Sequence, residues 1–186
     1  MMASQARIES NRWLRVQAAG VHGRVLSIGS GDDTDGEGRT YRQYFGRCTS
    51  YATSEAVPTP GCDLVLDVKR MPQVDDATFN CVFCSGVLEH VDDHEAALAE
   101  ITRILRPGGT LLLGLPFRQA IHLAPTDYWR FTEYGARVLL ERHGYQVDDL
   151  VAIDRNVPDF PAAYWARATK RERPMPATAP IARTRR

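Results

Sequence analysis

The sequence predicts an α/β domain: a mostly parallel β-sheet with helices on both faces and a C-terminal antiparallel strand pair. Three observations support this prediction. Short apolar segments alternate with longer segments in which apolar residues recur at helical spacing. The first apolar segment runs directly into Gly29-Ser30-Gly31, and glycines after a buried strand allow a sharp turn close to a ligand. The last two apolar segments follow each other without a helical segment between them.

The N-terminal quarter of the chain is expected to hold two helices and two strands. The first helix covers 5–19, where apolar residues lie mostly on one stripe, and Gly20 ends it. A short apolar strand follows over 24–28. A weak helix is expected over 35–45, before a second strand over 48–54.

Two further strands are expected over 62–67 and 78–85, the first of them after a turn at 58–61. Cys81 and Cys84 lie in the second of these strands. Residues three apart on a strand point to opposite faces, so this pair is not arranged to share a metal, and no second C-x-x-C is present. We therefore interpret both residues as buried apolar thiols and predict no metal site.

The second half of the chain begins with the strongest helical pattern, over 92–105. Asp92 or Asp93 can cap this helix, and Pro107-Gly108-Gly109 ends it. The remaining expected elements are a strand over 110–115, a helix over 132–143 capped by Thr132, and strands over 145–154 and 162–169.

The length and charge distribution limit the class of protein. The 186 residues suffice for one domain, expected over 1–169, with the helix over 5–19 as part of a lid. Residues 170–186 carry six basic side chains and one acidic one, which leaves 17 basic and 22 acidic side chains elsewhere, a net charge of −5. An acidic body argues against a nucleic-acid partner, because duplex binding needs a basic face. The tail, rich in Pro, Ala and Arg, is expected to be disordered.

No apolar run approaches the roughly 20 residues that span a bilayer, and the first ten residues do not form the apolar segment of a secretory signal. Four cysteines are common in a cytosolic protein. We therefore expect a cytoplasmic protein with no membrane span. The sequence does not indicate the oligomeric state.

Two carboxylates follow predicted strands at the edge where ligands bind in parallel sheets. Glu55 lies 24 residues after Gly31, where a carboxylate can accept both hydroxyls of an adenosine ribose. Asp67 closes the next strand and can accept from an adenine amino group. Glu55 is alternatively an exposed loop acid. The glycine loop departs from a nicotinamide fingerprint, because Thr34 stands where the third glycine is required.

One long segment resembles a known family. It contains Val87-Leu88-Glu89-His90-Val91, then Glu100, then Arg103-Ile104-Leu105-Arg106-Pro107-Gly108-Gly109. This arrangement is similar to the "VLEHV…E…R-x-L-[RK]-P-G-G" block of small class I S-adenosylmethionine-dependent methyltransferases. Residues 125–132 resemble a "DYWRF[ST]" segment found in one subset of these enzymes. The resemblance spans residues 5–169 and implies a Rossmann-like fold with S-adenosylmethionine as cofactor.

The resemblance also implies where the cofactor binds. The glycine loop would pack against its homocysteine part, Glu55 would hold the ribose, and Asp67 with Val68 would read the adenine. The residues after the fourth strand would line the far side of the cofactor. The complete implied set is Gly29, Ser30, Gly31, Asp32, Glu55, Asp67, Val68, Ser85, Gly86 and Val87.

Three positions depart from the family pattern. Ser27 stands where many members have an acid, Asp33 where they have a third glycine, and Asn80 where Asp is common. Asp32 and Asp33 are candidates to replace the missing carboxylate near the cofactor's amino group. These departures motivate an alternative, a non-catalytic cofactor-binding or scaffold protein that kept the fold. A nicotinamide oxidoreductase is a second alternative.

Candidate catalytic residues follow the fourth and fifth strands. Methyl transfer needs a base only for a weakly acidic acceptor such as a hydroxyl, and His90 and His122 could take that proton near neutral pH. Each is alternatively a loop histidine with a structural hydrogen bond. The chain has no large insertion to grip a macromolecule, so a small-molecule acceptor is expected, with O-methylation favoured.

The segment from Asp127 to Arg130 is a candidate acceptor-binding surface. It mixes charge with aromatic rings, which would suit a polar ring such as a sugar. The alternative is that Tyr128 and Trp129 pack under a lid while Arg130 pairs with Asp127.

Overall fold

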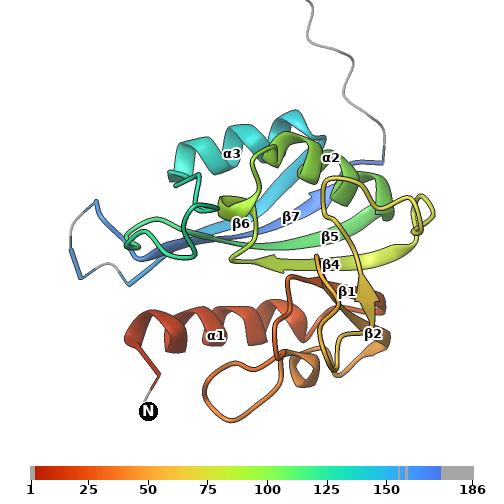
Figure 1. The fold of residues 1–186 in the computed structure, drawn as a ribbon, viewed down its shortest axis with the longest axis horizontal. Coiled ribbons are helices and arrows are strands. Elements are labelled where there is room, and N and C mark those ends of the chain that lie inside the picture. The colour runs from red at the N-terminus through yellow and green to blue at the C-terminus, as the bar shows by residue number, and fades with distance from the viewer. Residues whose placement is uncertain (1–2, 155, 158, 173–186) are drawn as a thin grey trace, which may run out of the picture.

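The computed structural model describes residues 3–154, 156–157 and 159–172, and a seven-stranded sheet forms its centre (Figure 1). The strand order is β3-β2-β1-β4-β5-β7-β6. Neighbours from β3 to β5 pair in parallel, whereas β7 pairs antiparallel with both β5 and β6. This arrangement confirms the predicted fold class. The strands are β1 (Gly23–Ile28), β2 (Cys48–Glu55), β3 (Leu64–Val65), β4 (Phe79–Ser85), β5 (Leu105–Pro116), β6 (Tyr145–Ile153) and β7 (Ala163–Lys170).

Helices cover both faces of the sheet (Figure 1). The helix α1 (Gln5–Ala18) lies on one face, and α2 (His94–Ile104) and α3 (Glu133–Arg142) lie on the other. Each begins at a side-chain cap: the caps are Ser4, Asp93 and Thr132, and each accepts a hydrogen bond from a backbone N–H in the first turn. Two short 3₁₀ helices, η1 (Tyr41–Tyr44) and η2 (Leu88–His90), follow β1 and β4 in the chain.

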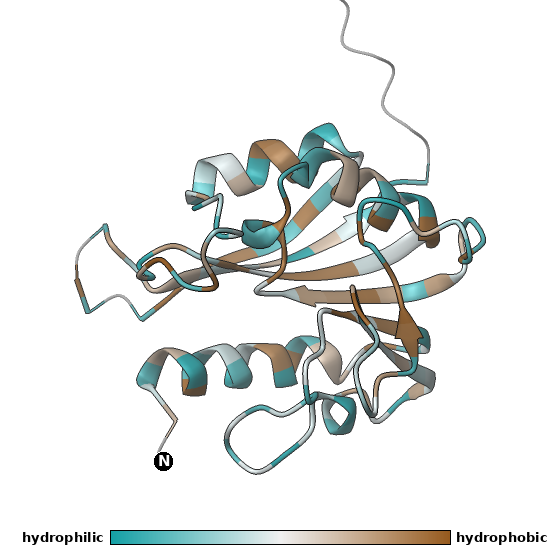
Figure 2. Ribbon diagram, viewed as in Figure 1, coloured by the Kyte–Doolittle hydropathy of each residue, from teal (hydrophilic) through white to brown (hydrophobic). Residues whose placement is uncertain are grey.

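The sheet separates two hydrophobic cores. Hydrophobic residues run along the central strands and recur along the helices that cover them (Figure 2). Cys81 belongs to the core beneath α1, and Cys84 belongs to the core beneath α2 and α3. The two thiols therefore point to opposite faces, as predicted, and burial raises the pKa of Cys81 to about 12.

The predicted helix over 35–45 is wrong, because only η1 is helical there. The buried Asp35 carboxylate accepts hydrogen bonds from the backbone N–H groups of Glu37 and Arg39, at 2.7 and 3.0 Å. These bonds hold the chain in a tight loop instead of a helical turn. Gly36 and Gly38 fit this loop, with φ of 70° and 93°.

The third strand is shorter than predicted, and β5 is longer. Only Leu64–Val65 pairs with β2, because the Asp63 carboxylate accepts from the Thr53 backbone N–H at 2.8 Å at one end. At the other end Asp67 accepts from the Lys69 N–H at 2.9 Å, which turns the chain away. At each end, the other predicted strands lie within one residue of the observed ones.

The last strand includes Lys170, whereas the sequence predicts that the tail begins at this residue. Its Nζ donates to the carbonyl oxygens of Thr102 and Leu105, each at 2.7 Å, which ties the strand end to the end of α2. The rest of the predicted tail lies mainly outside the described residues. Within the described residues, no helix is long and apolar enough to cross a membrane.

Candidate active site

The glycine loop brings the ends of β1 and β4 unusually close together. Gly29 has φ of 65°, and a Cβ at this position would lie 2.4 Å from Val87 Cγ2. No side chain fits there without displacing Val87, so Gly29 is required by the approach of the two segments as well as by its backbone conformation. Gly31 also has a positive φ, 55°, but a Cβ there would meet nothing within 4 Å.

The larger of two cavities at the strand ends, cavity A, has a volume of about 540 Å³. It lies beyond β1, β2 and β3, where parallel sheets bind ligands. Its walls combine apolar side chains with three carboxylates, those of Glu55, Asp67 and Asp92, and the backbone of the glycine loops. The predicted cofactor residues that line it are Gly29, Gly31, Glu55, Asp67, Val68, Gly86 and Val87.

Two of the three carboxylates of cavity A, Glu55 and Asp67, are held by nearby backbone groups. Glu55 Oε1 accepts a hydrogen bond from the Gly31 N–H at 2.5 Å, so the second strand end is tied to the glycine loop. The Asp67 carboxylate accepts a hydrogen bond from the backbone N–H of Lys69 and so stabilises the turn that follows β3. Lys69 Nζ in turn donates to Asp92 Oδ1 at 2.8 Å, and both of these residues line the cavity.

A second cavity, cavity B, has a volume of about 390 Å³ and lies between α1 and the ends of β4, β5 and β7. Arg7 and Asn11 reach it from α1, Tyr41 from η1 and Trp165 from β7. Sequence reasoning named helix 5–19 as part of a lid but singled out none of these side chains as site residues. The predicted residues Ser85, Gly86 and His122 also line it, so Gly86 belongs to both cavities.

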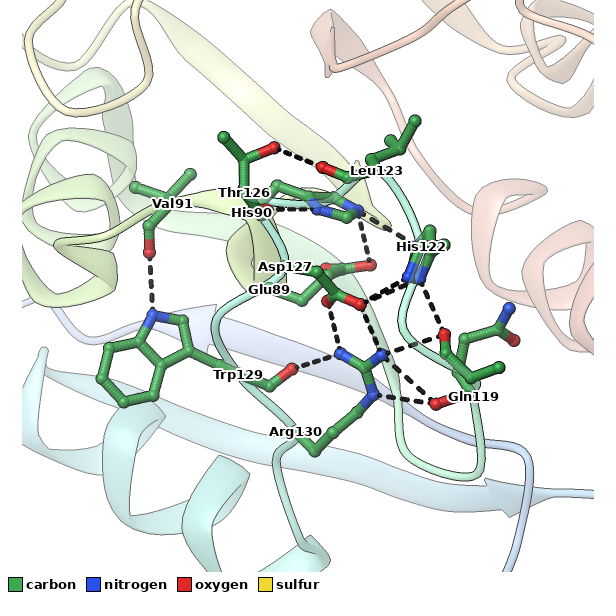
Figure 3. Close-up of polar contacts among 11 residues, drawn as sticks. Glu89, His90, Val91, Gln119, His122, Leu123, Thr126, Asp127, Trp129 and Arg130 are labelled. Carbon is green, nitrogen blue, oxygen red and sulfur yellow. Dashed lines mark hydrogen bonds and ion pairs between the residues drawn. The ribbon is translucent and has the colours of Figure 1, made fainter.

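Three polar side chains lie on the wall between the cavities: Glu89, His90 and His122 (Figure 3). The two histidines come from the segments after β4 and β5 and are brought together as edge-to-face rings, with Nε2 atoms 3.1 Å apart. Glu89 Oε1 lies 3.8 Å from His90 Nε2. Glu89 is 1% exposed, and this burial raises the pKa of its carboxyl group.

Asp127 and Arg130 support His122 from behind (Figure 3). Arg130 donates two hydrogen bonds to the Asp127 carboxylate, at 2.6 and 2.8 Å, and the His122 backbone N–H donates to the same carboxylate at 2.9 Å. The Arg130 guanidinium, with help from that N–H, holds the pKa of Asp127 well below its usual value. Asp127 therefore stays ionised as a fixed anchor for the His122 loop.

The other two residues predicted to bind the acceptor lie away from both cavities. Tyr128 and Trp129 are among the exposed large side chains and line neither cavity A nor cavity B. Trp129 Nε1 donates to the Val91 carbonyl at 2.9 Å, and its ring packs against His94.

Asp33, which departs from the family pattern, and its neighbours Asp32 and Ser30 have structural partners. Asp33 is 8% exposed, and its carboxylate accepts from the Tyr51 hydroxyl at 2.6 Å and from the Arg42 N–H at 3.1 Å. Asp32 accepts from Thr34, and neither aspartate lines cavity A or cavity B. Ser30 likewise lines neither cavity, because its hydroxyl donates to the Ser27 carbonyl at 2.9 Å.

The family-like residues Glu100 and Arg103 are structural as well. Glu100 accepts from the Met71 N–H at 2.7 Å, while Arg103 donates to the Met71 carbonyl at 2.9 Å and pairs with Glu100. The Arg103 guanidinium lowers the pKa of Glu100. Together they fix the segment that leads from β3 to β4, and with it the far wall of cavity A.

The sequence comparison agrees with this geometry. Residues 36–113 match the family described as "Methyltransferase domain". This match spans less than half of the chain and agrees with the resemblance to class I S-adenosylmethionine-dependent methyltransferases. S-Adenosylmethionine is the cofactor of this class. A curated relative, an uncharacterized 37.1 kDa protein in transposon TN4556 of Streptomyces fradiae, is 44% identical over 50 residues, which is 27% of this chain and 14% of that protein.

Solved structures resemble the chain over most of its length. A chain from the complex of the Haloferax volcanii Trm112 methyltransferase activator with a methyltransferase superposes with a TM-score of 0.70 at 16% identity, covering 90% of this chain and 91% of that one. The 1,6-didemethyltoxoflavin-N1-methyltransferase of Burkholderia thailandensis, solved with S-adenosylhomocysteine, gives 0.68 at 20% identity over 90% and 79%. The [4+2]-cyclase SpnF gives 0.68 at 13% over 89% and 80%. These likenesses describe the fold.

Proposed function

We propose that the protein transfers the methyl group of S-adenosylmethionine to a small molecule, at a hydroxyl of a metabolite or of a sugar-containing intermediate. The observation that supports this proposal is the contact between two cavities of different character. Cavity A and cavity B share Gly86, and a group with two imidazoles and a carboxylate stands on the wall between them. A methyl donor in one cavity and an acceptor in the other would meet at that wall.

Cavity A suits the nucleoside half of the cofactor. Glu55 offers carboxylate oxygens for the two ribose hydroxyls, and Asp67 offers one for the adenine amino group. The buried side chains of Leu66 and Val68 provide apolar surface for the adenine ring. The backbone of Gly29 and Gly31 approaches closely enough for the homocysteine part, because neither residue has a side chain.

The sulfonium cofactor supplies an already activated methyl group. The protein's own contribution is to hold the acceptor oxygen in line with that methyl and to exclude water. A hydroxyl acceptor must also lose its proton. Both imidazoles bond other groups through Nδ1, which leaves the Nε2 atoms to act at the wall between the cavities. His122 or His90 would take the proton there, and Asp127 with Arg130 would keep His122 in position.

The lining of cavity B supports a small polar acceptor. Arg7 and Tyr41 offer donors, and Trp165 offers a flat apolar surface of the kind that packs against sugar rings. A direct acceptor contact by Tyr128 or Trp129 stays a prediction. Cytoplasmic placement and the lack of a nucleic-acid partner also stay predictions of the sequence.

A thermal-shift titration with S-adenosylmethionine, S-adenosylhomocysteine and NAD tests the proposal. Ligand at about 100 times its dissociation constant adds about 2.7 kcal/mol of stability. In a domain of this size we expect a rise in Tm of about 5–10 °C with the two sulfur compounds and none with NAD. A shift with NAD alone would favour an oxidoreductase. No shift with any of the three would favour the non-catalytic scaffold, with Ser27 and Asp33 as the first residues to revert.

A further inference from the structure

The imidazoles of His90 and His122 face each other in an arrangement that two neutral rings do not satisfy. His90 Nδ1 lies 2.7 Å from the Thr126 carbonyl oxygen, and His122 Nδ1 lies 3.2 Å from both the Ala120 carbonyl oxygen and Asp127 Oδ2. These partners only accept hydrogen bonds, so each Nδ1 carries the hydrogen of its neutral ring. Each Nε2 then presents a lone pair, and the two lone pairs meet at 3.1 Å. A positively charged species is needed between them.

Glu89 adds a third ligand atom to the same place. The Glu89 side chain is only 2% exposed, and its Oε2 atom has no hydrogen-bond partner among the described residues. A buried carboxylate oxygen without a partner is costly, so it indicates a missing ligand. One carboxylate oxygen and one ring nitrogen from each histidine all lie within 4.8 Å of one another. A proton shared by the two rings would leave the buried Glu89 carboxylate without a partner, whereas a cation bound by all three side chains would compensate its charge.

We propose that Glu89, His90 and His122 form a binding site for a divalent first-row transition-metal cation on the wall between cavity A and cavity B. Two imidazoles and one carboxylate are a ligand set that such ions favour and that leaves coordination positions open. With metal–nitrogen bonds of about 2.1 Å, the 3.1 Å separation of the Nε2 atoms corresponds to an angle of about 95° at the metal. This angle is close to that between adjacent ligands of an octahedral ion.

The residues around the three ligands also fit a metal site. Histidines that bind metals usually donate their second ring N–H to a carbonyl or carboxylate, which fixes the ring. Thr126 provides that acceptor for His90, and Asp127 with Ala120 provides it for His122. Arg130 fixes Asp127 in turn. Both imidazoles are thus oriented before any ion arrives.

The site faces cavity B through Glu89 and His122, which suggests what the open coordination positions bind. This part of the inference rests on the proposed function: a hydroxyl or carbonyl oxygen of the acceptor would bind the metal next to the cofactor. The metal would lower the pKa of a bound acceptor hydroxyl, so that its proton passes to water and the oxygen takes the methyl group as S-adenosylhomocysteine leaves. His90 and His122 would then act as ligands in place of a general base.

Isothermal titration of the full, metal-stripped chain with Co²⁺ tests the site directly, with Mg²⁺ as a hard-cation comparison. We expect one Co²⁺ per chain and much weaker binding of Mg²⁺. His122→Ala and Glu89→Gln should each weaken Co²⁺ binding by about 100-fold, since each removes a ligand. His22→Ala is the matched control, because this exposed histidine lies at the opposite end of the strands, beside a different cavity, and it should leave Co²⁺ binding unchanged. Circular dichroism of each variant confirms that it is folded.

Several results would overturn the site: no stoichiometric Co²⁺ binding by the wild-type chain, equal losses in His22→Ala and His122→Ala, or folded ligand variants that bind as the wild type does. The outcome is separable from that of the proposed function. Co²⁺ binding with no response to S-adenosylmethionine would support the metal site and contradict methyl transfer. A response to S-adenosylmethionine without Co²⁺ binding would contradict only the metal site.

Discussion

Cavity A and cavity B lie at the same edge of the sheet but are built in different ways. Cavity A is lined mainly by short segments that directly follow β1, β2, β3 and β4, with backbone and glycines providing much of its shape. Cavity B combines side chains from α1 near the N-terminus with others from β5 and β7. A site made from strand ends follows from local sequence, whereas a site made from distant elements depends on how the whole chain packs.

The largest expected effect is a loss of stability when the Asp35 side chain is removed from the loop that supports cavity B. The buried Asp35 accepts hydrogen bonds from the Tyr44 hydroxyl and two backbone N–H groups, and its carbonyl accepts from Asn11 of α1. Asp35→Ala should lower the free energy of unfolding by about 4 kcal/mol in urea titrations at pH 7. The exposed Asp32 in the same loop is the control, and Asp32→Ala should cost much less.

The same residue predicts a pH dependence. Burial opposes ionisation of Asp35, but the hydrogen bonds from Tyr44, Arg39 and Glu37 outweigh it and set the pKa below its ordinary value. A carboxyl group with a lowered folded-state pKa stabilises the protein above pH of about 4, and this contribution is lost as the pH falls through the folded-state value. The stability difference between wild type and Asp35→Ala should therefore shrink from pH 7 to pH 3. An unchanged difference would contradict this role.

A smaller effect is expected where the close approach of two segments shapes cavity A. Gly29→Ala adds a Cβ that collides with Val87 and strains a backbone with φ of 65°. We expect S-adenosylhomocysteine binding to weaken by about 3 kcal/mol, or about 100-fold, by isothermal titration. Gly31→Ala carries similar backbone strain without a collision and should lose less. The double variant Gly29→Ala/Val87→Ala should regain part of the affinity, and no recovery would rule out the collision as the cause.

The proposed contact of Glu55 with the ribose predicts an intermediate loss of cofactor affinity. A charge-assisted hydrogen bond contributes about 1.5–3 kcal/mol, so Glu55→Ala should weaken binding of S-adenosylhomocysteine about 10- to 100-fold. Glu55→Gln keeps an oxygen that the Gly31 N–H can reach and should lose less. Wild-type affinity in Glu55→Ala would contradict the ribose role.

The smallest effect on cofactor affinity is expected at the wall between the cavities. His122→Ala should change the dissociation constant of S-adenosylhomocysteine by less than about twofold, because His122 lines cavity B and not cavity A. Methyl transfer to an acceptor found by screening should fall sharply in the same variant. Equal losses of cofactor affinity in His122→Ala and Glu55→Ala would remove the distinction between the two cavities.

The same contrast explains what the sequence could predict. The strands and the capped helices followed from periodicity, and Gly29, Gly31, Glu55 and Asp67 of cavity A followed from glycines and strand-end carboxylates. The family resemblance implied three further residues of that cavity, Val68, Gly86 and Val87. The helix over 35–45 failed because one buried aspartate redirected the backbone, and no periodic signal reveals such a side chain. The sequence indicates His90 and His122 as candidate bases. The 3.1 Å distance between their Nε2 atoms, however, depends on how two loops pack. Arg7, Asn11 and Tyr41 carry no motif, so only the packing of α1 and η1 reveals them.

The place of β7 in the sheet has a consequence for synthesis of the chain. In the described sheet β6 pairs with β7 alone, and β7 fills the gap between β6 and β5. A ribosome releases β6 first, so this strand must wait without a partner until the next one emerges. Ala163 and Trp165 of β7 also line cavity B. The nascent chain therefore contains every wall of cavity A before it can close cavity B.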